Sequence, residues 1–389
     1  MIEGLRICGS YSRYEELINI AYYWATTFSQ SMGDPSGGNI LKKTIKFVTL
    51  LAAATLVAGV AVAPASQAAK IKACVVLDTG GIDDHSFNAG SWAGAQAASN
   101  VANVSYLPST SSADFAPNIK KFVDQKCNII IGVGFSISAE IVKSAQANPS
   151  IKYAVVDDAG QACDANYNCV PVANVKGLTF ATNEAAFQAG YLAAGYSKSG
   201  VVATYGGAPY PTVTIFMDGF AKGVAYYNKV KGKSVKVLGW DPAKPSAGTF
   251  VGDFANTNKA LQLTQGFEQQ GADVILPVAG GLGGTTAGES LKSGKSVTIW
   301  VDTDGYYSAP QYASVLLTTV AKGLGAAVKS AITDTAKGTF TNTPYVGTLA
   351  NKGVSMAPLH DFSSKVSSRL QLDVKVIGQK IASGTLSAK

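Results

Sequence analysis

Residues 75–88 read Val-Val-Leu-Asp-Thr-Gly-Gly-Ile-Asp-Asp-His-Ser-Phe-Asn, and they decide the fold. Their apolar start is long enough for a buried parallel strand and too short for a helix. Two glycines then permit a sharp turn and close approach of the backbone to a ligand. Asp84, Ser86 and Asn88 are helix-capping residue types, and the alanine-rich segment 89–98 follows them. The pattern predicts strand, turn and helix, the place where open α/β sheets bind ligands.

The chemistry of this turn favours an uncharged ligand. It carries three carboxylates, one amide and one aromatic ring, and the next cation along the chain is Lys120. A bare phosphate would be a poor ligand, whereas a molecule rich in hydroxyl or amide groups and with a flat face would suit it. In the alternative interpretation, the acids only cap the helix and the glycines only turn the chain.

An enzymatic interpretation of the same turn is weaker. Residues 78–84 resemble the Asp-Thr-Asp-Pro-Gly-x-Asp-Asp calcium site of nucleoside hydrolases, but Gly80 stands where that motif has a further carboxylate. Calcium needs six or more oxygen ligands, so the loss of one carboxylate weakens this interpretation.

Composition excludes several classes of protein. The 389 residues suffice for two domains with a sizeable core. The net charge of +7 comes from scattered lysines without interleaved aromatic residues, which argues against nucleic-acid binding. Only His85 and His360 could supply imidazole. We therefore predict no catalytic residue, no metal and no cofactor.

The cysteines suggest an oxidising compartment. Cys163 and Cys169 bracket a polar loop and could close a small disulfide. Cys74 and Cys127 stand at predicted strand starts and are interpreted as small buried apolar residues, with a disulfide between them as the alternative.

The N-terminal part has the pattern of a secretory signal. Three lysines at 42–46 precede the apolar run 47–63 and the small residues Ser66 and Ala68, which fit a cleavage site. Met32 is then a candidate start, and we assign residues 1–69 to the leader. We expect an exported protein, periplasmic or extracellular.

From Ala69 onward, strand and helix patterns alternate in two similar halves, which predicts parallel sheets covered on both faces. The first half has strands at 73–77, 104–107, 128–133, 153–156 and 177–180, and helices at 89–98, 115–126, 138–147 and 184–196. The second half has strands at 201–205, 235–238, 273–276 and 297–301, and helices at 213–230, 256–270 and 285–293.

Aspartates or paired glycines follow nearly every predicted strand of both halves. Asp157-Asp158, Gly206-Gly207 and Asp302-Thr303-Asp304 are examples, and glycines are frequent in segment 280–284. Because no Gly-Lys-Ser/Thr follows these last glycines, a phosphate-binding P-loop is not predicted. Two lobes with a ligand cleft between them fit this recurrence.

Several of these segments resemble the basic membrane protein family, the substrate-binding proteins typified by the purine nucleoside receptor of ABC importers. The resemblance runs in order through nearly all of residues 70–389 and rests on segments 80–88, 132–135, 180–194, 271–275, 301–304 and 315–322. It implies an α/β fold of the type I periplasmic-binding-protein class, with two Rossmann-like lobes, parallel sheets, three crossovers and a central ligand cleft. We assign residues 70–198 and 304–345 to lobe 1, and residues 199–303 and 346–389 to lobe 2.

The resemblance also implies a nucleoside site. Phe87 can stack on a base, while Asp302 and Lys322 match the family's aspartate and lysine that hold the sugar. Carboxylates and amides suit the edges of a purine. Phe216 could instead be a core residue, and Lys322 could lie on a solvated helix face. The predicted ligand-binding residues are Asp78, Asp84, Phe87, Asn88, Phe135, Asp157, Phe216, Gly280, Asp302 and Lys322.

The predicted function is capture of a nucleoside, with purines favoured, and delivery to an ABC permease and its ATPase by a monomeric protein. Many family members are lipoproteins, but no cysteine stands at the predicted cleavage site, so we expect contact with the membrane only through the transporter. The alternatives are a receptor for another neutral ligand such as a sugar, a calcium-dependent nucleoside hydrolase, and a sensing protein without a transporter.

Overall fold

A computed structural model describes residues 69–166 and 168–389 of the chain, and residues 69–389 form one compact unit. The predicted leader and the candidate start at Met32 lie outside the described residues. Within the described part of the chain, no helix combines the length and apolarity needed to cross a bilayer.

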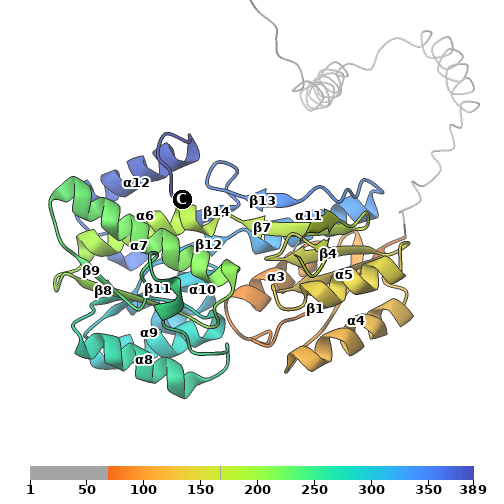
Figure 1. Cartoon of the computed structure of the whole chain (residues 1–389), viewed down its shortest axis with the longest axis horizontal. Helices are drawn as coiled ribbons and strands as arrows, with labels where there is room; N and C mark the ends of the chain where they lie inside the picture. The colour runs from red at the N-terminus through yellow and green to blue at the C-terminus, as the bar shows by residue number, and fades with distance from the viewer. Residues whose placement is uncertain (1–68, 167) are drawn as a thin grey trace, which may run out of the picture. The chain divides into compact units, whose positions relative to one another are not determined.

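Two six-stranded sheets form the centres of two lobes (Figure 1). All neighbouring strands of the first sheet are parallel. In the second sheet only β12 and β14 pair in antiparallel fashion. In spatial order the first sheet contains β13 (Tyr345–Gly347), β7 (Val175–Phe180), β4 (Lys152–Val156), β3 (Ile129–Val133), β1 (Ile71–Val76) and β2 (Ala102–Leu107). The second contains β14 (Val354–Met356), β12 (Leu316–Lys322), β11 (Val297–Asp302), β10 (Val274–Val278), β8 (Val201–Gly206) and β9 (Lys236–Leu238).

Helices cover both faces of each sheet, because successive strand residues point to opposite sides. Cys74 and Val76 of β1 pack in one apolar cluster, while Ala73 and Val75 pack in another. The helices of the first lobe are α3 (Phe87–Gln96), α4 (Phe115–Asp124), α5 (Ser138–Ala147) and α11 (Leu324–Ala336). Those of the second are α6 (Thr182–Tyr196), α7 (Pro211–Lys231), α8 (Thr257–Gln269), α9 (Gly283–Ser293), α10 (Gly305–Ser308) and α12 (Ser368–Ala382).

The chain passes between the lobes three times. It crosses through α6 between β7 and β8, through α11 between β12 and β13, and again between β13 and β14. These crossovers, with the two parallel sheets, confirm the predicted two-lobed α/β fold. They also bring the carboxyl ends of strands from both sheets to a common region between the lobes.

The predicted lobe boundaries are wrong at two places. β12 lies within residues 304–345, which we assigned to lobe 1, but it pairs with β11 in the second sheet. α6 lies within residues 70–198, yet it packs mainly on α7 and α12 of the second lobe. The physical reason is that both segments bury their apolar side chains against second-lobe partners before the chain crosses.

The described residues contain two disulfides. Cys163–Cys169, predicted from the sequence, closes a hairpin of β5 (Gln161–Cys163) and β6 (Cys169–Pro171). Cys74 also pairs with Cys127. Our preferred interpretation of these two as unpaired apolar residues was therefore wrong, and the alternative is confirmed. Both cysteines are buried. Because β1 and β3 are neighbours in the sheet, Cys74 within β1 and Cys127 just before β3 lie close enough for a bond.

Candidate functional site

One cavity of about 620 Å³, counting its open mouth, lies between the lobes. Every residue predicted for the site lines this cavity, so the structure brings all of them together. They are Asp78, Asp84, Phe87, Asn88, Phe135, Asp157, Phe216, Gly280, Asp302 and Lys322. Their role in ligand binding stays a prediction.

The lining residues come from the carboxyl ends of strands in both sheets. Asp78 follows β1 and Asp157 follows β4, while Asp302 and Lys322 end β11 and β12. Gly134, just after β3, has φ +112°, and a side chain there would meet the Asp78 carboxylate at 2.3 Å. Only glycine fits that position, and it lets the backbone close around Asp78.

An ion-pair network crosses the cavity and joins the lobes. The Lys322 ammonium lies 2.5 Å from Asp157 Oδ2 and 3.5 Å from Asp302 Oδ1. Lys322 is 9 % exposed, so the alternative of a solvated position is wrong. Burial raises the pKa of Asp157 to about 6, although the Lys322 charge lowers it. Burial alone lowers the pKa of Lys322, but the two carboxylates more than offset this and hold it above its ordinary value.

Aromatic rings surround the same ammonium group. Its nitrogen lies 4.9 Å from the ring centre of Phe216 and 5.1 Å from that of Phe87, distances at which a cation is attracted to a ring face. Phe216 is 1 % exposed and belongs to the large apolar cluster as well, so the core interpretation and the cavity interpretation both describe it.

One carboxylate oxygen of Asp302 accepts a hydrogen bond, and the other does not. Oδ2 accepts a hydrogen bond from the Ser86 hydroxyl of the other lobe at 2.8 Å. Oδ1 is buried and, among the described residues, receives no hydrogen bond, with only the Lys322 contact at 3.5 Å nearby. Buried acceptors without a donor are uncommon and unfavourable in folded proteins. A ligand donor in the cavity would remove this deficit.

Asp84 and Asn88 have different surroundings, because their polar atoms already bind the turn that contains them. Asp84 accepts the backbone N–H groups of Ser86, Asn88 and Ala89 at 2.7–3.0 Å, and thus caps the start of α3. The Asn88 amide donates to Asp84 at 3.2 Å and accepts from the Asp78 N–H at 2.9 Å. These contacts hold the Asp84 and Asn88 side chains within the turn.

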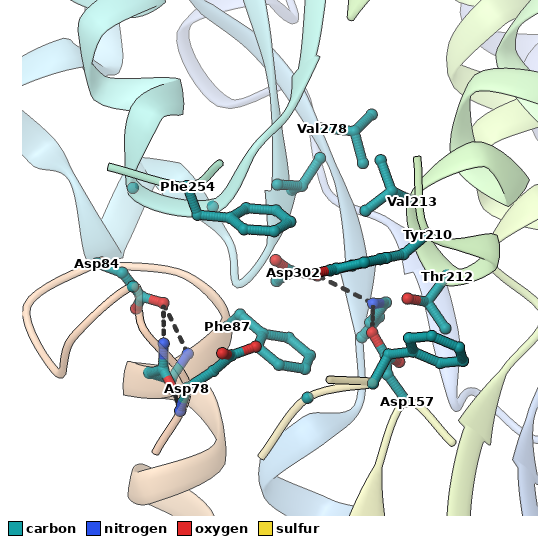
Figure 2. A pocket seen from close by; sticks show the side chains of 18 of the residues that line it. Asp78, Asp84, Phe87, Asp157, Tyr210, Thr212, Val213, Phe254, Val278 and Asp302 are labelled. Carbon is teal, nitrogen blue, oxygen red and sulfur yellow. Dashed lines mark hydrogen bonds and ion pairs between the residues drawn. The ribbon is translucent and has the colours of Figure 1, made fainter. Parts of the chain in front are cut away.

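The Asp78 carboxylate accepts fewer hydrogen bonds than the Asp84 carboxylate. Its Oδ1 accepts the N–H of Thr79 at 2.7 Å, and both oxygens lie 3.3 Å from the Ser136 hydroxyl. Burial raises the pKa of Asp78, while these hydrogen bonds lower it. Figure 2 shows the Asp78 carboxylate next to Phe87, on the same side of the cavity.

Sequence reasoning missed two aromatic residues. Tyr210 lies 5.4 Å from Phe135 and 6.1 Å from Phe254 between ring centres, so a row of rings spans the two lobes. Figure 2 shows Phe254 and Phe87 facing the same space from different lobes. Tyr210 could have been found, because it follows the glycine-rich end of β8. Phe254 lies in a long loop that carries no strand-end signal.

The comparisons with known proteins decide the family. The Bmp model, described as "ABC transporter substrate-binding protein PnrA-like", matches residues 71–389. The chain belongs to this family. The resemblance drawn from the sequence segments is thereby confirmed. The Bmp family is one of substrate-binding proteins rather than enzymes, and substrate-binding proteins of ABC importers act outside the cytoplasm.

Individual Bmp relatives are distant but extend over most of the chain. A "CD4+ T-cell-stimulating antigen" of Listeria innocua is 27 % identical and covers 80 % of this chain and 86 % of its own length. An "ABC transporter nucleoside-binding protein BmpA" of Lactococcus lactis is 29 % identical over 74 % of this chain and 81 % of its own. A solved solute-binding protein of Aeropyrum pernix is 22 % identical with a TM-score of 0.69, over 82 % and 92 % of the two chains, and supports the fold.

Proposed function

We propose that this ABC transporter substrate-binding protein captures a nucleoside, with purines favoured, and delivers it to an importer. The observation that carries the proposal is the buried Asp302 Oδ1, which lacks a donor beside the charged Lys322. A ligand that fits must bring hydroxyl donors to this point and a flat apolar surface to the rings around it. Nucleosides have both features, and the Lactococcus relative is named a nucleoside-binding protein.

The ribose half of such a ligand suits the ion-pair network. Vicinal hydroxyls can donate to Asp302 Oδ1, the acceptor that the protein leaves unused. Lys322 has three N–H donors and makes one hydrogen bond, to Asp157 Oδ2, so it can also donate to a ribose oxygen. Hydrogen bonds that involve charged groups are the stronger kind, which favours a polyol at this place.

The base half suits the aromatic side of the cavity. Phe87 from the first lobe and Phe254 from the second face the same space (Figure 2), and a flat ring can stack on either. The Asp78 carboxylate lies beside Phe87 and can accept N–H groups from the edge of a base. Asp84 and Asn88 shape this wall, but their polar atoms are committed within the turn.

Ligand binding would be coupled to the approach of the lobes. Ser86 donates to Asp302 across the cleft, and the Thr303 hydroxyl donates to the His85 carbonyl at 2.7 Å. A ligand that contacts Asp302 and Phe87 together would favour this closed arrangement, in which an importer could recognise the loaded protein. The protein performs no chemistry on the ligand in this account.

Calorimetry with a panel of ligands tests the proposal. Inosine, guanosine, adenosine and uridine should bind, the purine nucleosides most tightly, while ribose, free bases and hexoses should bind at least tenfold more weakly. A hexose that binds more tightly than every nucleoside would contradict the proposal and favour the sugar receptor. Release of free base from inosine in the presence of calcium would favour the hydrolase.

A further inference from the structure

The fold gathers cationic side chains from four separate segments at one end of the second lobe. All are exposed, and we call this set the basic corner. It consists of Lys198, Lys229, Lys231, Lys233, Lys236, Lys365 and Arg369. Four of these lysines lie within residues 229–236 of the sequence, and the structure adds the other three members of the set.

Three backbone features bring the first part of the corner together. α7 ends at Lys231, and Gly232, with φ +62°, reverses the chain so that Lys233 N–H bonds back to Asn228. The chain then enters β9, which begins at Lys236 and pairs with the start of β8. Lys198 precedes that start by only a few residues, in the turn between α6 and β8.

The α12 side of the corner is attached by direct contacts. Lys231 and Arg369 both bind the Asp373 carboxylate of α12, at 2.7 Å and 3.1 Å. Lys365 lies 4.3 Å above the ring of Phe362, and that ring meets Tyr196 at the end of α6, close to Lys198. These contacts join the α12 side of the corner to the ends of α6 and α7.

The positive charge of this surface is mostly uncompensated. Between residues 185 and 240 the single acidic residue is Asp218, which accepts from the Trp240 indole at 2.9 Å. Asp373 contacts two of the cations, and Asp273 uses one oxygen for the N–H groups of Lys198 and Ser199. The remaining lysines of the corner face solvent.

The amino ends of strands in the first sheet also carry lysines, but three of these lysines contact other groups of the protein. Lys72 donates to the Gln125 carbonyl at 3.0 Å. Lys176 lies 3.8 Å from Asp334, and Lys152 lies over the Phe340 ring at 5.5 Å. These three lysines are therefore less free than the lysines of the basic corner.

We infer that the basic corner binds the anionic phospholipid headgroups of a membrane surface, a direct contact in addition to the one expected through the transporter. Clusters of four to eight lysines or arginines are attracted to an anionic membrane surface. Six of the corner residues are lysines, whose mobile point charges suit a field of headgroups, whereas a single bound phosphate favours the planar fork of arginine. The nearby rings of Tyr191, Tyr226 and Tyr227 pack against one another between α6 and α7, so they are not available to stack nucleic-acid bases.

This surface lies away from the cavity. The corner surrounds the amino ends of β8 and β9, while the ligand cavity lies at the carboxyl ends of β10, β11 and β12. A protein held at a membrane through this corner would keep its cavity accessible to solutes. The inference does not rest on the identity of the ligand.

Vesicle co-sedimentation of residues 69–389, the compact unit, tests the inference. The vesicles contain phosphatidylcholine with roughly 30 % phosphatidylglycerol, and binding is measured in about 50 mM and about 500 mM NaCl. A variant with Lys198, Lys229, Lys233 and Lys236 changed to Gln should bind at least tenfold less well at low salt. The control variant changes four exposed lysines on other elements, Lys143, Lys244, Lys259 and Lys329, to Gln and should keep most of the binding.

The outcomes separate cleanly. Support consists of salt-sensitive binding to the anionic vesicles that the corner variant loses and the control variant keeps. The inference is overturned if the unaltered protein ignores anionic vesicles, binds phosphatidylcholine alone equally well, or loses as much binding in the control as in the corner variant. Unchanged thermal unfolding and nucleoside affinity in the corner variant establish that it is folded.

Discussion

Two groups of polar side chains line the same cavity but differ in how far the protein itself satisfies them. Asp84 and Asn88 bind backbone and side-chain groups of their own turn, at distances from 2.7 to 3.2 Å. Asp157, Asp302 and Lys322 instead bind across the cleft, and Asp302 keeps a buried oxygen without a donor. The first group holds the loop in shape, and the second leaves an acceptor that a ligand of the proposed kind could use.

The difference teaches that lining a cavity is a weak criterion for binding a ligand. Asp84 and Asp302 are equally buried, at 5 % exposure, and both face the cavity. What distinguishes them is the number of hydrogen bonds already made. Variants of the two groups should therefore separate effects on affinity from effects on stability.

The largest expected effect is a pH dependence of stability that comes from Asp157. Its pKa of about 6 in the folded protein exceeds the ordinary 3.8, so the folded state binds the proton more tightly than the unfolded state. Its contribution to stability therefore falls as the pH rises from about 4 to about 6, by on the order of 3 kcal/mol. Denaturant unfolding across this range should show the unaltered protein losing stability relative to Asp157→Asn as the pH rises, because asparagine cannot ionise. A gain in stability of the unaltered protein relative to the variant as the pH rises would contradict the assignment.

Asp302→Asn should weaken nucleoside binding by about 2 kcal/mol, roughly thirtyfold, because a charged acceptor for the ribose is lost. Asparagine is the suitable replacement, since Asp302 has φ +70° and asparagine tolerates this conformation. Calorimetry measures the effect, and Asp241→Asn in an exposed loop is the matched control. Equal affinities of both variants would remove Asp302 from the site.

Phe87→Leu should weaken nucleoside binding by about 1–2 kcal/mol, because leucine keeps apolar volume but cannot stack on a base. The same change should leave any weak ribose binding nearly unaltered. Competition with ribose measures both quantities in one preparation. A proportional loss for ribose and nucleoside would place the base elsewhere.

Asp84→Ala should act on stability instead of affinity. The loss of the cap at α3 should lower the free energy of unfolding by about 1 kcal/mol. Nucleoside affinity of the folded variant should change less than it does in Asp302→Asn. The comparison between the two groups fails if affinity falls more in Asp84→Ala than in Asp302→Asn.

The smallest expected effect belongs to Ser86→Ala, which removes the hydroxyl that donates to Asp302 across the cleft. The variant should bind a nucleoside about 0.5–1 kcal/mol more weakly, since the closed arrangement loses one hydrogen bond. Small-angle X-ray scattering of the ligand-free protein should show a larger radius of gyration than for the unaltered chain. An unchanged radius together with unchanged affinity would show that this contact does not control closure.

The convergence of the predicted residues on one cavity could be foreseen from the sequence, because parallel strands align their carboxyl ends. Asp78, Asp157 and Asp302 each follow an apolar run, and any parallel arrangement of those runs brings the residues to one edge. The family resemblance added Lys322, which stands at the end of β12. Residue type and strand position sufficed for these side chains.

Other features depend on contacts that no local pattern carries. β12 joins the second sheet through pairing with β11, and the sequence around it fits either lobe. Cys74 and Cys127 are bonded because β1 and β3 are neighbours, which requires the strand order. Phe254 reaches the cavity from a loop without a distinctive motif. The hydrogen bonds from the α3 backbone to Asp84 were anticipated only by the alternative interpretation, in which the acids of the turn cap the helix.

A crystal structure of the protein grown with inosine tests the central claim most directly. The account predicts ribose hydroxyl oxygens within about 3 Å of Asp302 Oδ1 and the base stacked on Phe87, with Lys322 and Asp157 still paired. Inosine bound outside the cavity, or inside it with its ribose away from Asp302 and that oxygen still without a donor, would contradict the account.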